Sequence, residues 1–283
     1  MNTLFIQADE QQLLGAKVAK FAVEKHLNNK SSVDIKILNV STMPIFLNLV
    51  GKTYLRNGRI LTYTLDDLQA FTLSRIMPPE LMGFRGRAVV IDPDVFFLAD
   101  VNELFNMDMQ GKAIACTRYH EKDMWESSLM LLDCAKLTHW KAKEILKKFV
   151  EKELDYLDIV RLRKETSILE IPRVWNSFDK ITPETKVLHT TKRLTQPWKT
   201  GLPIDFTPSP MPKFFGIIPR ELVHKLLGKY PTHYLPHPNK EVEEFFIALV
   251  RETYKAGQIT EEEIRTAVEK RHVRADLFEI IVS

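Results

Sequence analysis

The feature that most constrains the fold is the alternation of strand-like and helix-like segments from the first residues onward. Residues 3–8 ("TLFIQA") and 33–40 ("VDIKILNV") are predicted strands, and an amphipathic helix is expected between them from Gln11 to His26. This alternation is typical of an α/β domain with a mostly parallel central sheet flanked by helices. Further strands are expected at 88–91, 113–117, 127–132, 167–171 and 186–190, and further helices at about 64–77, 136–153 and 156–165.

The strand "RAVVI" is the most informative, because two aspartates follow it. Its aliphatic run is typical of a strand buried on both faces, and Asp92 and Asp94 come next, on either side of a proline. Ligands of open α/β sheets bind beyond the carboxyl ends of the strands. Carboxylates at that place suit Mg²⁺ or Mn²⁺ bridging to the phosphates of a nucleotide. An alternative stays open, in which both aspartates form a turn before a helix that starts in "ADVNEL".

The composition changes after residue 200. Five prolines fall between residues 203 and 219, too many for one continuous helix or strand. Beyond them the pattern is helical, over residues 219–228, 240–256 and from a capping box of Thr260 with Glu263 onward. The sequence therefore predicts an α/β domain over residues 1–200 and a proline-rich linker with a helical C-terminal extension over residues 201–283.

Charge and composition exclude several classes of protein. The 283 residues are 45% hydrophobic, and 40 basic and 37 acidic residues are mixed along the chain to a net charge of +3, which argues against a nucleic-acid binder. No transmembrane segment or secretory signal is apparent, and Cys116 and Cys134 are expected to be buried free thiols. These features predict a cytoplasmic protein. Peripheral membrane contact and self-association into a homo-oligomer stay open.

The stretch "FTLSRIMPPELMGFRGRAVVIDPDVFFLADVNELF" resembles the block that marks family 8 glycosyltransferases, which are retaining enzymes with the glycosyltransferase A fold. That block has a helix with Ser-Arg or Ala-Arg, a loop, an aliphatic strand, Asp-x-Asp and a run ending in Leu-Trp, and the resemblance covers most of residues 3–200. It implies that Asp92 and Asp94 bind Mn²⁺ or Mg²⁺ and that Arg75 contacts the donor sugar or its phosphates. The opening segment is similar too, which implies that Asp9 pairs with the base or ribose while Ala8 packs against the ring. A plain helix cap is the alternative for Asp9.

The segment "VWNSFDKITPETKVLHTTKRLTQPWKTG" is similar to the late part of the same family, where Trp-Asn precedes a strand ending in histidine and then Lys-Pro-Trp. The similarity implies that His189 is a third metal ligand, a set that favours Mn²⁺, and that Trp198 lies at the donor. The segment departs from the pattern because it is one residue longer, lacks the glycine and has Gln196 before the proline. The phosphate-binding lysine is therefore displaced or absent, with Lys192 and Arg193 as nearby substitutes.

Two more stretches carry implied donor-sugar residues. The run "DYLDIVRL" resembles the family's Asp-Gln-Asp helix start, which makes Asp158 the matching carboxylate, while Asp155 is expected either to share that role or to cap the helix. In "MWESSLMLLDC", Glu126 and Ser128 stand where the family has asparagine and glycine. The resemblance thus implies that Asp158, Glu126 and Arg75 orient the sugar.

The resulting expectation is a metal-dependent glycosyltransferase that moves a sugar from a nucleotide-sugar donor, a UDP-sugar, to an acceptor hydroxyl with retention. Two alternatives stay open. One is a catalytically inactive glycosyltransferase-like binding or scaffold protein. The other is a nucleotidyltransferase, which would normally have a Gly-rich phosphate loop after the first strand, whereas this chain has only Gly15, inside the predicted helix.

Overall fold

The computed structural model describes residues 2–67, 69–119, 124–205 and 231–283. The helix expected over residues 219–228 and most of the proline-rich segment lie outside the described residues.

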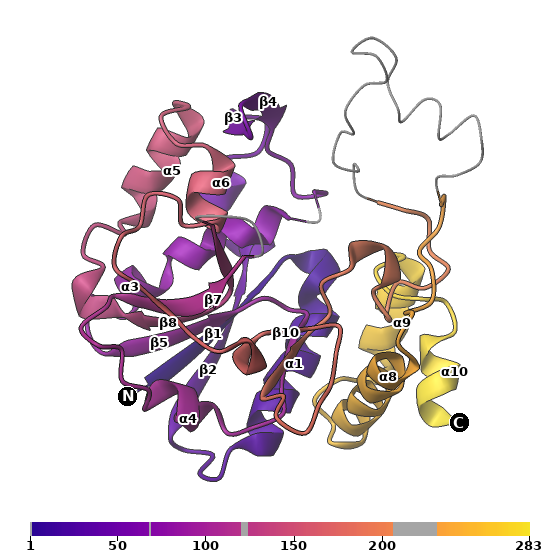
Figure 1. Cartoon of the computed structure of the whole chain (residues 1–283). Coiled ribbons are helices and arrows are strands. Elements are labelled where there is room, and N and C mark those ends of the chain that lie inside the picture. The colour runs from indigo at the N-terminus through magenta and orange to yellow at the C-terminus, as the bar shows by residue number, and fades with distance from the viewer. Residues whose placement is uncertain (1, 68, 120–123, 206–230) are drawn as a thin grey trace, which may run out of the picture.

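The centre of the molecule is a six-stranded sheet in the order β2-β1-β5-β8-β7-β9 (Figure 1). Its strands are β1 (Asn2–Ala8), β2 (Val33–Asn39), β5 (Arg87–Ile91), β7 (Ile114–Arg118), β8 (Trp125–Asp133) and β9 (Ile168–Glu170). β8 runs antiparallel to both of its neighbours, whereas β1 is parallel to β2 and β5, and β7 is parallel to β9. The mostly parallel α/β sheet expected from the alternating pattern is confirmed.

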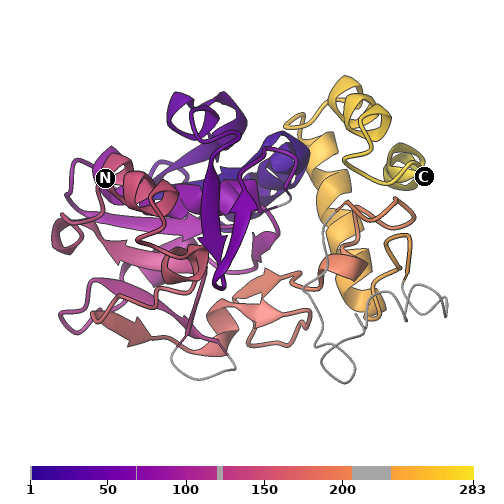
Figure 2. The ribbon, with the colours of Figure 1, turned by 90° about the horizontal axis from the view of Figure 1, so that it is seen from above.

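Helices cover both faces of this sheet, which explains why its strands are so apolar (Figures 1 and 2). Alternate residues of β5 belong to two hydrophobic clusters: Val89 and Ile91 to one, Ala88 and Val90 to the other. The first cluster includes α1 (Leu13–His26), α8 (Lys240–Lys255), α9 (Glu261–Glu269) and α10 (Leu277–Val282). The second includes the 3-10 helix η3 (Ala70–Ile76), α5 (Ala142–Val150) and α6 (Tyr156–Val160).

The C-terminal helices pack directly on the α/β core. Phe246 of α8 lies with its ring centroid 5.7 Å from that of Phe96 and 5.2 Å from that of Trp198. α9 begins at the predicted capping box, because the Thr260 hydroxyl accepts from the Glu263 backbone N–H while the Glu263 carboxylate accepts from the Thr260 backbone N–H. One continuous hydrophobic cluster therefore joins the sheet to the extension.

Three predicted helices differ from the structure. Instead of a helix from Thr64, turns lead into η3, and Pro78 then begins the short helix α3 (Pro78–Leu81). The predicted start was wrong because the side chain of Asp67 accepts from the backbone N–H of Gln69 in a local turn. α5 and α6 are shorter than expected, since Lys152 and Leu162 follow them with φ of 65° and 51°, outside the helical range.

Two smaller sheets contain the other strands of the described ranges. β10 (Ser177–Phe178), β11 (Val187–His189) and β6 (Val95–Phe97) form a three-stranded sheet. An unpredicted hairpin joins β3 (Thr53–Arg56) to β4 (Arg59–Thr62). The remaining short elements are η1 (Glu10–Gln12), η2 (Val40–Thr42), α2 (Pro44–Leu47), α4 (Val101–Phe105), η4 (Cys134–Lys136), η5 (Arg173–Trp175) and η6 (Arg193–Thr195).

The cysteines are both free and buried, as predicted. Burial, together with the nearby charge of Asp133, raises the pKa of the Cys134 thiol to about 12, so neither packing nor charge favours a reactive thiolate there. Within the described ranges, no helix combines the length and the apolar character needed to cross a bilayer.

Candidate metal and nucleotide site

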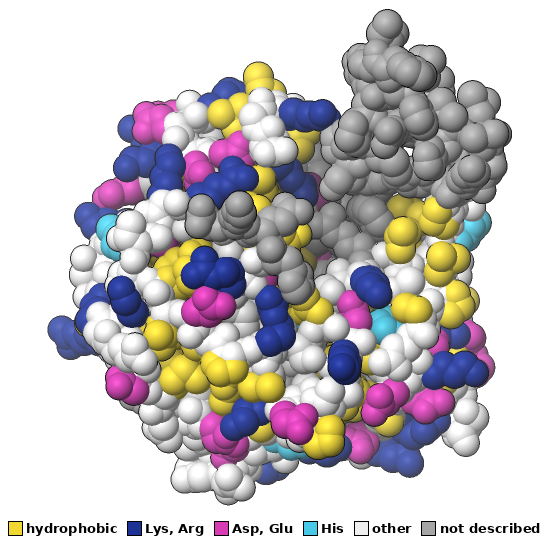
Figure 3. Space-filling model, in the orientation of Figure 1, with side chains coloured by type: hydrophobic (Ala, Val, Ile, Leu, Met, Phe, Trp, Pro, Cys, Tyr) yellow, Lys and Arg dark blue, Asp and Glu magenta, His cyan; other side chains and the backbone are white. Residues whose placement is uncertain are grey.

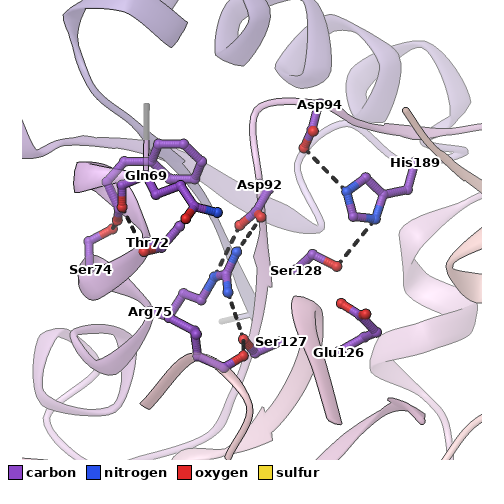
Figure 4. Close-up of polar contacts among 12 residues, drawn as sticks. Gln69, Thr72, Ser74, Arg75, Asp92, Asp94, Glu126, Ser127, Ser128 and His189 are labelled. Carbon is purple, nitrogen blue, oxygen red and sulfur yellow. Dashed lines mark hydrogen bonds and ion pairs between the residues drawn. The ribbon is translucent and has the colours of Figure 1, made fainter. Parts of the chain in front are cut away.

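Three predicted ligand residues meet at one edge of the central sheet (Figure 4). Asp92 follows β5 directly, and Asp94 comes two residues later, just before β6. His189 ends β11, which pairs antiparallel with β6 so that His189 lies opposite Val95. One possible ligand atom from each of Asp92, Asp94 and His189 lies within 4.8 Å of the others. The strand pairing therefore brings together groups that are about a hundred residues apart in the chain.

The His189 ring is held by a buried amide. Its Nδ1 lies 2.9 Å from Oδ1 of Asn176, and the Asn176 amide nitrogen donates to the hydroxyls of Ser128 at 3.1 Å and Thr117 at 3.3 Å. Because those hydroxyls use the amide N–H groups, the amide oxygen is left to accept from Nδ1 of His189. The lone pair of Nε2 then faces Asp94, whose Oδ1 is 3.5 Å away. A histidine that binds a metal through one ring nitrogen is usually oriented in this way, by a hydrogen bond from its other ring nitrogen to an oxygen of the protein.

Asp92 is held from the other side by Arg75 (Figure 4). The Arg75 Nε donates to Oδ1 at 3.1 Å and its Nη2 donates to Oδ2, while Nη1 donates to the hydroxyl of Ser127 at 2.7 Å. Burial raises the pKa of Asp92 to about 6, because the Arg75 charge offsets only part of the desolvation. Near neutral pH the Asp92 carboxylate is therefore ionised, and the positive charge of Arg75 already balances part of its negative charge.

The donor set fits a divalent cation. Asp94 Oδ1 is buried and accepts no hydrogen bond from any residue of the described ranges. Burial lowers the pKa of His189, but the neighbouring carboxylates, chiefly Asp94 and then Asp92 and Glu126, together outweigh this effect and leave the pKa raised. The site thus favours a cation beside Asp94, either a proton on the imidazole or a metal ion. Two carboxylates and one imidazole nitrogen suit Mn²⁺ better than Mg²⁺.

Asp9 lies at the end of the neighbouring strand β1. Its Oδ1 accepts from the backbone N–H of Gln12 at 2.9 Å, so it caps η1, as one of the two sequence interpretations proposed. Its Oδ2 is buried without a partner among the described residues, and so are both amide atoms of Gln7. Burial raises the pKa of Asp9 to about 7 against the lowering effect of the Gln12 hydrogen bond.

These unpartnered groups border the metal residues. Gln7 and Asp9 share one face of β1, because side chains alternate along a strand, and the pairing of Ile6 with Ile91 places Gln7 next to Asp92. Buried polar groups are nearly always hydrogen-bonded to protein, water or ligand. The end of β1 is therefore a cluster of buried polar groups suited to a ligand rich in donors and acceptors.

The residues expected to orient the sugar have other partners in the structure. Glu126 is buried and pairs with Arg161 at 2.8 Å. Asp158 belongs to the capping box of α6, where its Oδ2 accepts from the Asp155 backbone N–H at 3.0 Å, and it also pairs with Lys164 at 3.4 Å. Asp155 caps the same helix, so the capping role left open for it is confirmed.

The segment after His189 is arranged differently from its expectation. Lys192 is exposed, the side chain of Arg193 lies outside the described part of the chain, and Trp198 is buried against Phe246. Sequence reasoning missed Lys199, which is fully buried, pairs with Asp205 and lowers the pKa of Asp9 by its charge. Its position directly after Pro-Trp was the available signal.

Sequence comparison gives a distant relative. No family model matches the chain. Protein CDI of Arabidopsis thaliana is 23% identical over 191 residues, which cover 61% of this chain and 68% of that protein. This level of identity does not establish a family.

Solved structures give a clear likeness of fold. The galactosyltransferase LgtC, in a complex with donor and acceptor sugar analogues, matches with a TM-score of 0.50 at 13% identity over 70% of this chain and 89% of its own. The glycosyltransferase GlyE of Streptococcus pneumoniae matches with a TM-score of 0.50 at 14% identity over 82% of this chain and 64% of its own. The bifunctional glycosyltransferase WbbM matches with a TM-score of 0.50 at 12% identity over 71% of this chain and 47% of its own. The chain therefore has a fold of the glycosyltransferase A type, as expected from its sequence.

Proposed function

We propose that this chain is a metal-dependent glycosyltransferase that transfers a sugar from a UDP-sugar to an acceptor hydroxyl with retention. The observation that carries the proposal is the buried group of Asp92, Asp94 and His189 at the carboxyl end of the central strands. This is the edge at which ligands bind in open α/β sheets, and the fold is one that known glycosyltransferases share.

The three clustered residues would hold Mn²⁺ or Mg²⁺. When bound there, a divalent cation neutralises the diphosphate as it leaves the sugar. Asn176 fixes the imidazole so that Nε2, and not Nδ1, faces the carboxylates. Arg75 lies beside Asp92 with its guanidinium already oriented, which suits a contact with the donor sugar or its phosphates.

The remaining predicted residues are proposed to contact different parts of the donor. Asp9 and the unpartnered Gln7 amide would meet the base or ribose of the donor, with Ala8 beneath it. Asp158 and Glu126 stay predictions for the sugar, and Lys192, Arg193, Lys199 and Trp198 stay candidates for the diphosphate side. An acceptor hydroxyl that attacks from the leaving-group face needs no protein nucleophile, so retention requires no further side chain.

Calorimetric titration with UDP tests the proposal. The protein should bind UDP far more tightly with Mn²⁺ than without it, and it should slowly hydrolyse at least one nucleotide sugar from a panel. Equal affinity for UDP with and without Mn²⁺ would refute the metal site. Mn²⁺-dependent binding without turnover of any donor would instead identify a binding or scaffold protein.

A further inference from the structure

A second group of charged residues lies where β7 ends and β8 begins, at the pairing of Arg118 with Trp125. We call it the arginine cluster, and it consists of Arg118, Arg161 and Arg173. Each guanidinium lies over an aromatic ring, at 4.4 Å from the Trp125 centroid, 3.9 Å from that of Tyr119 and 4.4 Å from that of Phe178. Figure 3 shows basic, acidic and hydrophobic side chains gathered in the middle of the visible face. Stacking on rings fixes the planes of the guanidinium groups.

The arginine cluster holds more positive than negative charge. Arg118 pairs with Glu170 at 2.9 Å and Arg161 pairs with Glu126 at 2.8 Å. Within the described part of the chain, no carboxylate lies at ion-pair distance from Arg173. Its guanidinium donates to Thr117 Oγ1 at 3.4 Å and to the backbone carbonyl of Arg118, and its other N–H groups have no acceptor among the residues that the structure describes.

Burial also lowers the pKa of Arg173, although the charges of Glu126 and Glu170 oppose this. A half-buried arginine is costly to maintain without a counter-ion, and the described residues provide none at ion-pair distance from Arg173. A planar guanidinium with unused donors matches the oxygens of a carboxylate or phosphate. Arg173 is therefore suited to bind an anion supplied by a ligand.

Two separate routes connect Arg173 to the candidate metal group. Thr117 Oγ1 accepts from Arg173 and from the amide of Asn176, and Asn176 in turn holds His189. Independently, the guanidinium of Arg173 stacks on the ring of Phe178, and this ring packs edge-on against the His189 ring with the two centroids 5.3 Å apart. Arg75 contacts a different member of the metal group, Asp92 (Figure 4). Arg75 therefore contacts the metal group through Asp92, whereas Arg173 is connected to it through His189.

We propose that the acceptor is an anionic sugar or polyol, carrying a carboxylate or a phosphate, and that Arg173 binds this anion with Arg118 and Arg161 beside it. This inference rests on the proposed glycosyltransferase function. An acceptor anchored at Arg173 would present a hydroxyl near the sugar carried at Asp92, Asp94 and His189. The arginine cluster would then select for charge, whereas Glu126 would keep Arg161 in place.

Acceptor pairs that differ in charge test this inference. Glucuronic acid and glucose 6-phosphate would each be compared with glucose, using Mn²⁺ and the donor found by the nucleotide-sugar panel. We expect kcat/KM to favour an anionic acceptor over glucose by about 10-fold or more, as one charge-assisted hydrogen bond would supply. A preference for the glucuronic acid identifies a carboxylate acceptor, and a preference for glucose 6-phosphate identifies a phosphate acceptor.

Arg173→Gln should remove most of this preference, about 10-fold, by raising KM for the anionic acceptor, and Arg173→Lys should restore part of it. The matched control is Arg265→Gln, because Arg265 also lies over an aromatic ring, at 4.6 Å from the Phe278 centroid, and pairs with Glu261 at 2.7 Å. It belongs to the C-terminal helices and should leave the preference unchanged. If no sugar is transferred to any of the three acceptors, binding can be compared in place of kcat/KM. Saturation-transfer NMR would then measure how glucuronic acid, glucose 6-phosphate and glucose each bind to the protein in its complex with UDP and Mg²⁺.

The possible failures are distinguishable. A wild-type protein that does not bind UDP with Mn²⁺ overturns the proposed function itself. A wild-type protein that binds UDP but treats charged and neutral acceptors alike overturns only the anionic acceptor, and so does an Arg173→Gln variant with the full preference.

Discussion

Asp92 and Asp94 are two residues apart, yet their surroundings give them different chemistry. Asp92 is buried and both of its oxygens accept from Arg75. Asp94 has a buried oxygen without a hydrogen bond from the described residues, directed at Nε2 of His189. A cation entering the site would therefore gain most from Asp94, whereas at Asp92 it would share the carboxylate with Arg75.

Asp94→Ala should accordingly abolish the effect of Mn²⁺ on UDP binding while the fold stays intact. Titration of UDP with and without Mn²⁺ measures this, and circular dichroism checks the fold. Asp108→Ala is a suitable control, because Asp108 lies outside the site, where its carboxylate accepts the local backbone N–H of Gln110 at 2.8 Å. A variant that still binds UDP more tightly with Mn²⁺ would exclude Asp94 as a ligand.

Asn176→Ala tests the proposed orientation of His189. Without the amide oxygen, Nδ1 loses its 2.9 Å partner and the ring is free to rotate or to change tautomer. Loss of the hydrogen-bond partner that orients a metal-binding histidine typically weakens metal binding about 10- to 100-fold. The measurement is the Mn²⁺ concentration needed for half-maximal UDP binding. An unchanged concentration would mean that Ser128, 3.3 Å from Nδ1, suffices to orient the ring.

Asp9→Asn should change how stability depends on pH. The folded-state pKa of about 7 lies above the ordinary 3.8, so the contribution of Asp9 is complete below about pH 4 and is lost as the pH rises through 7. Asparagine keeps an oxygen for the Gln12 N–H but cannot ionise. The variant should match the wild type near pH 4 and exceed it near pH 8, by at most about 4 kcal/mol. Urea unfolding at both pH values measures the difference.

Asp100→Asn is the opposite control for that experiment. The backbone N–H groups of Asn102 and Asn28 outweigh desolvation and hold the pKa of Asp100 below its ordinary value. Its stabilisation is present above about pH 4 and is lost as the pH falls through the folded pKa, so removal of its charge should cost stability near pH 8. If Asp9→Asn also lost stability near pH 8, the carboxylate of Asp9 would have a partner.

The ligand residues could be predicted from sequence because each one lies at or next to an end of a strand, and strand ends are visible as the limits of apolar runs. The residues that hold these ligands in place could not be predicted. Asn176 and Ser128 are 48 positions apart in the chain and meet only through the folded sheet. The arginine cluster was likewise invisible, since nothing in the spacing of Arg118, Arg161 and Arg173 indicates a shared location.

At the scale of elements, the strands were the easiest to predict, because a strand buried on both faces is uniformly apolar. The β3–β4 hairpin was missed since all four residues of β4 are exposed and show no apolar alternation. It is held by a distant residue instead. Both oxygens of Asp155 accept backbone N–H groups of the hairpin turn, from Asn57 at 3.0 Å and Gly58 at 2.9 Å.

Asp155→Ala should therefore cost more than an ordinary helix cap. It would remove the cap of α6, where Oδ1 accepts from Leu157 N–H at 2.8 Å, together with both hairpin contacts. The expected loss exceeds the about 1 kcal/mol typical of a cap. Urea unfolding gives the value, and Thr260→Ala, which removes only the cap of α9, is the matched comparison. Equal losses in both variants would show that the hairpin contacts add nothing.

At the scale of the whole molecule, one hydrophobic core contains residues from both sides of the domain boundary predicted at residue 200. The sheet residues Leu4 and Ile6, the α1 residues Val18 and Ala22, and Phe246 of α8 belong to one cluster and are essentially unexposed. Ion pairs at the surface add to this contact, joining α1 to α8 through Lys25 and Glu252 at 2.6 Å. The composition change that suggested two units lies in the proline-rich segment and says nothing about packing between them.

If the cluster acts as one unit, Phe246→Ala should destabilise α1 as much as α8. The substitution removes a fully buried ring between Phe96 and Trp198, which typically costs about 3–5 kcal/mol. Amide hydrogen exchange read by mass spectrometry measures the two helices separately in one sample. We expect the most protected amides of α1 and α8 to lose the same free energy of protection, because both become exposed in the same unfolding event. Val282→Ala, on an exposed side chain of α10, is the control and should alter neither. Faster exchange confined to the C-terminal helices would show that they open independently, and would support a separate unit after residue 200.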